Sequence, residues 1–329
     1  MSIAEARTTL WLAETALARS GAGVFAGPTG ILTFVGPDAR RFCNGMFTNN
    51  IRNLAVGRAN QNAMVDDKAR LQGLHDVACL ADPTDPDSGK PVGHFRVTLE
   101  GVTVEQFMTR YEKYIIFDDV ELTDVSDAWR VLTVQGPDAA GRLTAAGLPV
   151  PATEGDVVAV AGDLTGATVT RRARSKAGGY DVCLPAGEVE AWTEKLGPQL
   201  DDAVLERLRV EAGIVRWPVD MGERSLPHEL GVVPRMCSFE KGCYIGQEVI
   251  NRIDVMGQVQ KRVWGLVSDV LLEPGTEVRM GDDVVGSVLS GVQEDGFCRA
   301  LVLLRKAAWT PGLVVDVGGQ SARVSDLPF

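Results

Sequence analysis

The sequence predicts an α+β protein in which two related units of strands and helices precede a small β-rich domain. The first observation is a strand–Gly-Pro-Asp–helix pattern that occurs twice, as FVGPDARRF from residue 34 and VQGPDAAGRL from residue 134. The second is an alternation of strand-length apolar runs with segments of helical periodicity. The third is a change at residue 258, after which short β-rich runs with Gly-Asp turns follow one another. We therefore expect two domains, residues 1–257 and 258–329.

The first unit begins after a helix predicted over residues 4–19. The run ILTFV at 31–35 is typical of a buried strand, and Gly36-Pro37-Asp38 opens the next helix. Residues 60–80 predict two strands around a turn at 66–68, and residues 81–94, which are rich in Asp-Pro and Gly, predict a surface loop. Residues 94–104 predict a further strand.

A helix closes the first unit, and the second unit repeats the same kinds of element. In residues 105–117, apolar side chains recur at helical spacing. After the repeated strand–helix pattern, residues 159–185 predict two strands with a turn, and residues 188–196 a helix. The apolar positions Leu205, Leu208, Ala212 and Val215 predict one face of a further helix.

Composition excludes several functional classes. The chain has 329 residues, a formal net charge of −11 and a pI of about 4.9. This charge disfavours nucleic acid and anionic membranes as partners. No apolar run reaches the roughly 18 residues of a membrane span, and the N-terminus lacks the pattern of a signal peptide. We expect a cytoplasmic protein with reduced thiols.

The cysteines and histidines do not form a recognisable metal site. The six cysteines contain no C-x-x-C pair, and no histidine stands near a cysteine at zinc-ligand spacing. There are only three histidines, His75, His94 and His228, so a histidine-based triad is poorly supported. The sequence predicts no metal centre.

Glu211 is a candidate ligand-binding residue beside the predicted helix face. A carboxylate there is usually solvated. Its two acceptor oxygens would also suit a flat N–H/NH₂ edge, such as that of a pterin. Both interpretations stay open on the residues alone.

A basic cluster stands out in this acidic chain: Arg171, Arg172, Arg174 and Lys176. Arginine and lysine often occupy a solvated hairpin edge, which is the favoured interpretation. The alternative is a seat for the polyanionic tail of a ligand.

The segment EKGCYIGQEV at 240–249 is the most unusual stretch. Gly242 supplies conformational freedom for a turn, and Tyr244 begins a periodic run that predicts a helix. Cys243 would then lie near a helix N-terminus and next to Lys241, and both effects favour the thiolate. Gln247 and Glu248 fall in the first turn. Alternatively, the glycines shape a turn and Cys243 packs inward.

The longer segment SFEKGCYIGQEVINR resembles the K-G-C-Y-x-G-Q-E signature of the YgfZ group in the folate-binding T-protein (aminomethyltransferase) superfamily. The signature comprises Lys241 to Tyr244, Gly246, Gln247 and Glu248, with Arg252 at its trailing arginine. The resemblance extends over nearly the whole chain. FCNGMFTNNI is similar to the superfamily's F-L-Q-G-x-x-T-N-D, and LRVEAGIVRWPVDM to its L-R-x-E-x-G-x-P.

The resemblance implies two α/β subdomains and a C-terminal β-barrel, arranged as a ring around a tetrahydrofolate pocket. It assigns Glu211 to the residue that holds the pterin. It implies a role in the assembly or repair of iron–sulfur clusters, with iron–sulfur enzymes or cluster-assembly proteins as partners. The aminomethyltransferases carry a catalytic aspartate a little beyond the Asp66-Asp67 turn. Here the corresponding position falls near Leu74, and Asp76 is out of register.

Three functional hypotheses follow. The first is a tetrahydrofolate-binding accessory factor for iron–sulfur proteins, with Cys243 as functional thiol and Lys241 beside it. The second is a folate-dependent aminomethyltransferase or demethylase, for which Asp66, Asp67 and Asp76 are the nearby carboxylates. The third is a folate-binding module without turnover, stabilised by its ligand.

Overall fold

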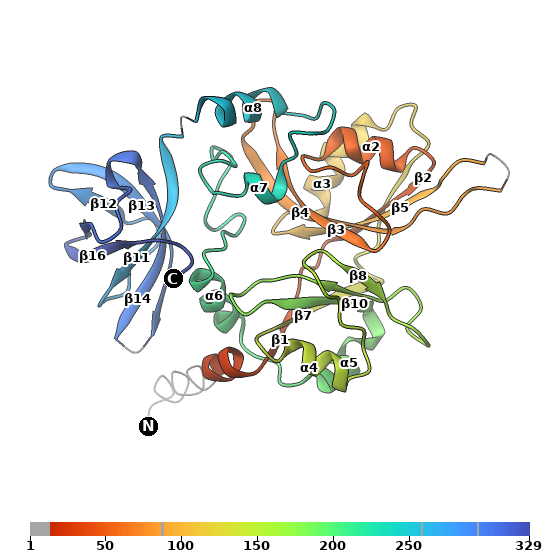
Figure 1. Cartoon of the computed structure of the whole chain (residues 1–329), viewed down its shortest axis with the longest axis horizontal. Coiled ribbons are helices and arrows are strands. Elements are labelled where there is room, and N and C mark those ends of the chain that lie inside the picture. Colours follow the sequence, from red (N-terminus) through yellow and green to blue (C-terminus); the bar gives the residue numbers. More distant parts are fainter. Residues whose placement is uncertain (1–13, 87–88, 258, 295) are drawn as a thin grey trace.

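The computed structural model describes residues 14–86, 89–257, 259–294 and 296–329, and it shows three units (Figure 1). Two units are five-stranded sheets with helices, and the third is a closed six-stranded barrel. The predicted α+β organisation is confirmed. The N-terminal residues 14–20 are helical, whereas residues 4–13 of the predicted helix lie outside the described residues.

The first sheet is built from residues 31–124, and all its neighbouring strands are antiparallel. Its order is β3 (Arg58–Val65), β4 (Leu71–Ala81), β5 (Gly93–Glu100), β2 (Ile31–Gly36) and β6 (Glu121–Asp124). Its helices are α2 (Ala39–Met46) and α3 (Val104–Tyr111), followed by the short 3₁₀ helix η1 (Glu112–Tyr114). Thr103 and Gln106 form a capping box that fixes the start of α3. A large core that includes Phe34, Phe47 and Phe107 lies between this sheet and its helices.

The second sheet combines the first strand of the chain with strands from residues 129–185. Its order is β1 (Gly23–Ala26), β7 (Trp129–Gln135), β10 (Gly179–Pro185), β9 (Thr168–Arg171) and β8 (Val157–Ala159). Its helices are α4 (Ala139–Ala145), η2 (Ala186–Glu188) and α5 (Val189–Leu196). The sequence did not indicate that β1 crosses into this sheet, where Val24 lies opposite Val134.

The predicted repeat is confirmed as two strand–helix units, β2–α2 and β7–α4. Each helix begins after an aspartate whose backbone N–H bonds to a neighbouring segment. Asp38 N donates to Asp119 O at 3.1 Å, and Asp138 N donates to Gly21 O at 3.0 Å. The same short sequence therefore makes the same kind of connection in both units.

Three helices connect the sheets to the barrel: α6 (Asp202–Glu211), α7 (Val233–Met236) and α8 (Gln247–Met256). Asp201 caps the start of α6 by accepting a hydrogen bond from Ala203 N. The sequence predicted a helix that reached Val215, and this was wrong, because α6 ends at Glu211. Gly213 follows with a φ of +69°, a left-handed conformation that ends a helix. Val215 therefore lies beyond the helix.

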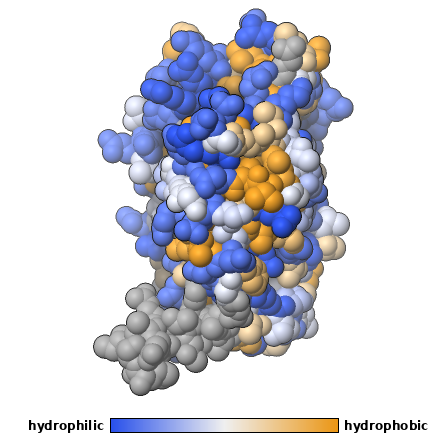
Figure 2. Space-filling view, turned by 90° about the vertical axis from the view of Figure 1, so that its left-hand side faces the viewer, coloured by the Kyte–Doolittle hydropathy of each residue, from blue (hydrophilic) through white to orange (hydrophobic). Residues whose placement is uncertain are grey.

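The barrel closes in the order β11-β14-β13-β12-β15-β16 and has its own core. Its strands are β11 (Lys261–Ser268), β12 (Glu277–Met280), β13 (Asp283–Glu294), β14 (Phe297–Arg305), β15 (Val314–Val317) and β16 (Gln320–Ser325), with η3 (Lys306–Ala308) after β14. Residue 258, the predicted boundary, lies outside the described residues. Figure 2 shows the barrel side of the molecule, which is largely hydrophilic around an apolar patch.

Within the described residues, no helix combines the length and the apolar character needed to cross a membrane.

Candidate functional site

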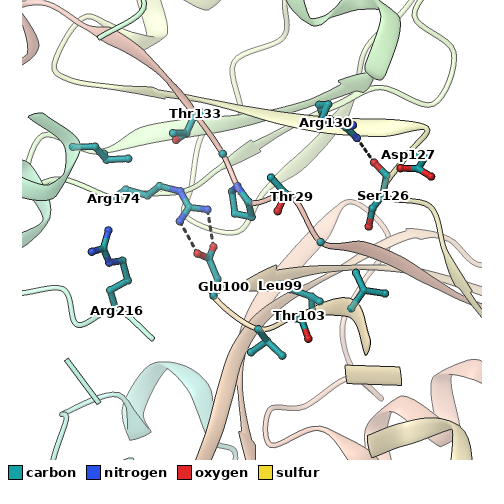
Figure 3. A pocket seen from close by; sticks show the side chains of 18 residues that line it. Thr29, Leu99, Glu100, Thr103, Ser126, Asp127, Arg130, Thr133, Arg174 and Arg216 are labelled. Carbon is teal, nitrogen blue, oxygen red and sulfur yellow. Dashed lines mark hydrogen bonds and ion pairs between the residues drawn. The ribbon is translucent and has the colours of Figure 1, made fainter. Parts of the chain in front are cut away.

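Three adjoining cavities lie where the two sheets meet the segment from α6 to α7. We call the middle one, of about 230 Å³, the deep cavity. The basic cavity, of about 670 Å³, shares Asp76, Arg172 and Arg235 with it. The far cavity, of about 730 Å³, shares Glu100 and Arg174 with the deep cavity (Figure 3). Together they form a continuous series of hollows between the units.

Strand β4 places Leu74 and Asp76 on one face, and both side chains line the deep cavity. Residues two apart on a strand share a face, so the offset by two does not remove Asp76 from the cavity. Asp76 lies opposite Gln61 of β3, which lines the same cavity. The register of Asp76 against the catalytic acid of the aminomethyltransferases stays a prediction, but its side chain lines the deep cavity together with Leu74.

Asp76 belongs to a buried charge network that joins the two sheets. Arg172 Nε donates to Asp76 Oδ2 at 2.7 Å. Burial raises the pKa of Asp76 to about 6, although the Arg172 guanidinium acts in the opposite direction. The carboxyl group is therefore poised to hold or release a proton near neutral pH.

Arg174 continues this network towards the far cavity. Its guanidinium donates to both oxygens of Glu100, at 3.0 and 2.7 Å, and to both oxygens of Asp181, at 3.1 and 2.7 Å. Figure 3 shows the guanidinium of Arg174 directed at the carboxylate of Glu100, with both hydrogen bonds between them marked. Such two-pronged contacts fix geometry as well as charge.

The basic cluster does not form a solvated hairpin edge throughout. The side chains of Arg172 and Arg174 are only 12% and 14% exposed and belong to the network. Arg171 and Lys176 instead line the basic cavity with Arg235. In the described part of the chain, no carboxylate lies within ion-pair distance of Arg171 or Arg235, so both remain available to an anionic group.

Glu211, the predicted pterin residue, lies at the end of α6 and lines a separate cavity of about 270 Å³. Its Oε1 accepts hydrogen bonds from Arg299 Nη1 at 2.8 Å and from Arg19. Arg19 also pairs with Glu294 of the barrel. The structure therefore brings Glu211 to the barrel rather than to Asp76, and its role towards a pterin stays a prediction.

Lys241 holds the unusual segment against the end of α2. Its ammonium group donates to the carbonyl oxygens of Asn44, Phe47 and Asn49, which match its three N–H bonds. The Nζ atom also lies 4.9 Å from the centre of the Tyr244 ring. Burial lowers the pKa of Lys241 to about 8. Because these carbonyls occupy the ammonium group, Lys241 anchors the segment.

Two expectations about this segment were wrong in detail. Helix α8 begins at Gln247 with Gly246 as its N-cap, so Cys243 lies ahead of the helix N-terminus. Gly246, not Gly242, has the left-handed conformation, with a φ of +80°. A Cβ atom on Gly246 would lie 2.6 Å from Asp66 O, so the segment packs closely on the β3–β4 turn.

Cys243 is exposed, whereas the other five cysteines are buried, and the structure describes all six. The interpretation that Cys243 packs inward is therefore wrong. Tyr244 behind it is buried, and Glu248 and Arg252 of α8 are exposed. Gln247 Nε2 makes a long contact of 3.5 Å with Lys241 O. The motif thus presents one thiol to solvent on an anchored loop.

The remaining candidates contribute less to the cavities. Asp66 Oδ1 accepts hydrogen bonds from Lys68 N and Arg70 N and shapes the turn. His75 is buried among Phe47 and Phe107, and burial lowers its pKa to about 3. Among the described residues, no group of three or more His, Cys, Asp or Glu side chains is arranged to hold a metal ion.

Sequence reasoning missed Gln61 and Arg235 as cavity residues and undervalued Asp76. The signal for Asp76 was available, because period-two alternation along β4 puts it on the face of Leu74. No comparable signal marked Arg235, since the short helix α7 is placed by tertiary packing.

Comparisons with known proteins agree with this architecture. The crystal structure of glycine cleavage system aminomethyltransferase T from Bartonella henselae matches with a TM-score of 0.84 and 21% identity, covering 96% of this chain and 88% of that one. This match confirms the predicted T-protein-like fold with its C-terminal barrel.

Two relatives represent different functions. The chain is 25% identical over 334 residues to an aminomethyltransferase of Rubrobacter xylanophilus, which covers 96% of this chain and 85% of the relative. It is also 25% identical over 238 residues to the mitochondrial iron–sulfur cluster assembly factor IBA57 homologue of Pyricularia oryzae, covering 71% and 54%. The family model described as the GCVT N-terminal domain matches residues 4–241, well over half of the chain. The chain therefore belongs to this family and to the T-protein superfamily.

Proposed function

We propose that this protein is a YgfZ-type, tetrahydrofolate-binding accessory factor in the assembly or repair of iron–sulfur clusters, with Cys243 as its functional thiol. The observation that carries the proposal is the exposure of Cys243, since the other five cysteines are buried. A thiol that acts on a partner protein must be accessible to it. The family resemblance, which sets Leu74 near the position of the aminomethyltransferase acid, favours the same proposal.

The described cavities have properties that suit a folate. The basic cavity, of about 670 Å³, lies within the range typical of small-molecule sites. Arg171 and Arg235 would bind the carboxylates of the glutamate tail, because neither has a carboxylate partner in the described part of the chain. Gln61 and Asp76 in the adjoining deep cavity offer hydrogen-bonding groups for a polar ring edge. When bound, tetrahydrofolate would supply nitrogen atoms that carry one-carbon groups.

Folate binding is tested by calorimetric titration with 5-formyltetrahydrofolate, a stable reduced folate. We expect Arg171→Ala and Arg235→Ala each to weaken binding about tenfold, as loss of a charge-assisted hydrogen bond implies. Glu211→Gln tests the alternative position of the ring: it should weaken binding by a similar factor if the pterin lies in the separate cavity at the barrel, and leave affinity unchanged if the ring lies at Gln61 and Asp76. Arg305→Ala, on the exposed end of β14, is the matched control. Unchanged affinity in both cavity variants would contradict binding in the basic cavity.

The thiol role is tested by complementation in cells that lack the wild-type gene. We expect Cys243→Ala to fail to restore the activity of iron–sulfur enzymes. Gly242→Ala changes the adjacent exposed residue, where a Cβ atom meets no atom within 4 Å, and should complement fully. Full complementation by Cys243→Ala would exclude the thiol role.

A second candidate function, one-carbon transfer to or from folate, is favoured by the position of Asp76. Its carboxyl group lines the deep cavity and has a pKa raised to about 6 by burial, so it would exchange a proton with a bound ring at near-neutral pH. Purified protein should then form methylenetetrahydrofolate from an amine donor, and Asp76→Asn should abolish this activity. No product with a panel of donors would count against this function.

A further inference from the structure

A fifth cavity, of about 390 Å³, lies between the two sheets and shares no lining residue with the four cavities described above. We call it the inter-sheet cavity. Strands of both sheets line it, with Arg96 and His94 from β5 on one side and Thr168 from β9 on the other. Neither the proposed folate site nor the exposed thiol uses these residues.

Arg96 is buried without a counter-charge. Phe95 and Val97 on either side point into the first core, so alternation along β5 directs Arg96 to the opposite face, towards the second sheet. The residue is 7% exposed. In the described part of the chain no carboxylate lies within ion-pair distance of its guanidinium, and Nε is buried without a hydrogen-bond partner. A buried charge normally has a partner, because desolvation is costly.

A second buried polar group in the same cavity also has no partner. Thr168 is 6% exposed, and its Oγ1 makes no hydrogen bond within the described structure. Its hydroxyl can donate one hydrogen bond, and the Arg96 guanidinium can donate several in a planar fork. Two donors on opposing sheets therefore converge on one cavity that contributes no acidic side chain.

The charge of the cavity limits which kind of anionic group it can bind. His94 lies on the same strand face as Arg96, and burial, assisted by the Arg96 charge, lowers the pKa of His94. The imidazole is therefore neutral at pH 7, and Arg96 supplies the single positive charge. One positive charge with a planar fork matches a carboxylate better than a doubly charged phosphate. The rest of the wall is largely apolar: Val56, Leu80, Val125, Trp129, Val157 and Ala159.

We propose that the inter-sheet cavity binds a small monocarboxylate with an apolar body, whose carboxylate accepts hydrogen bonds from Arg96 and Thr168 while the apolar body packs among the side chains around Trp129. The site is separate from the basic cavity and does not depend on folate binding. Because strands of both sheets line the cavity, ligand binding there would stabilise the contact between the two sheets.

The test uses 4-phenylbutyrate as the probe and 4-phenylbutan-1-ol as its uncharged analogue, each titrated into the full chain by calorimetry. We expect the wild-type protein to bind the acid at least tenfold more tightly than the alcohol. Arg96→Met should remove this preference, and Thr168→Val should reduce it several-fold. Arg305→Met, the same substitution at an exposed position of the barrel, should leave it unchanged. Equal binding of acid and alcohol by the wild-type protein would overturn the proposal.

Thermal unfolding gives an independent readout. Without ligand, Arg96→Met should melt at a higher temperature than the wild-type protein, because it removes an unpaired buried charge. A lower melting temperature would show that groups of the protein itself hydrogen-bond the guanidinium, and would overturn the proposal.

If Arg96→Met does not fold, a crystal structure of the wild-type protein with 4-phenylbutyrate decides the question. The carboxylate must then lie within hydrogen-bond distance of Arg96, and binding elsewhere refutes the site.

Discussion

Leu74 and Asp76 lie on one face of β4, and both side chains line the deep cavity. A carboxyl group is therefore present in the deep cavity, two residues beyond Leu74 along the strand. The environment of this carboxyl group differs from that of a solvated aspartate. Arg172 donates a hydrogen bond to Asp76, and Arg235 lines the same cavity. The charge network continues through Arg174, which bonds to Glu100 and Asp181.

Asp76 should make stability depend on pH in a specific direction. Its folded pKa, about 6, lies above the ordinary value of 3.8, so the folded state binds the extra proton between these values. The stabilising contribution is complete below about pH 4 and is lost as the pH rises through 6. We expect Asp76→Asn to gain stability relative to the wild-type protein over this window, by up to about 3 kcal/mol. Urea unfolding at pH 4, 5, 6 and 7 measures the difference. A constant difference across the series would contradict the raised pKa.

The two glycines that flank the exposed thiol should respond differently to alanine. Gly246→Ala introduces a Cβ atom 2.6 Å from Asp66 O at a φ of +80°, and should destabilise the protein by about 2–3 kcal/mol. Gly242→Ala meets no atom within 4 Å and should change stability by less than about 0.5 kcal/mol. Chemical denaturation compares the pair. Equal effects would show that the segment does not rest on the β3–β4 turn.

Lys241→Met should destabilise the protein through the backbone. It keeps much of the aliphatic length but leaves the carbonyls of Asn44, Phe47 and Asn49 without the ammonium donors, at a cost of about 2–3 kcal/mol. Lys261→Met, at the exposed start of β11, is the control for loss of one positive charge. If the two variants unfold at the same denaturant concentration, Lys241 is not an anchor.

Thiol titration of the native protein should detect one reactive cysteine per chain. Cys243 is exposed and the other five cysteines are buried, so a polar disulfide reagent should modify Cys243 rapidly and the others only on unfolding. Cys243→Ser should abolish the rapid phase, and full reaction in denaturant should then yield one thiol fewer than in the wild-type protein. A rapid phase that persists in Cys243→Ser would place a reactive thiol elsewhere.

The sequence predicted the architecture better than the chemistry. The strand–helix repeat and the β-rich C-terminal segment are local patterns, and the structure confirms both. The partners of individual side chains depend on tertiary contacts between distant segments. Lys241 precedes Cys243 by two residues, yet its ammonium is directed to carbonyls nearly two hundred positions earlier in the chain. Glu211 lies next to an apolar helix face, yet it pairs with Arg299 of the barrel.

The position of β1 in the second sheet has a consequence for how the chain assembles during synthesis. β1 leaves the ribosome before any strand of the first sheet, but its hydrogen-bonding partner β7 begins only at Trp129. The first sheet, residues 31–124, is therefore complete while β1 still lacks its neighbour. Unpaired strand edges favour association with other chains. The nascent protein therefore needs protection from aggregation between the synthesis of β1 and the synthesis of β7.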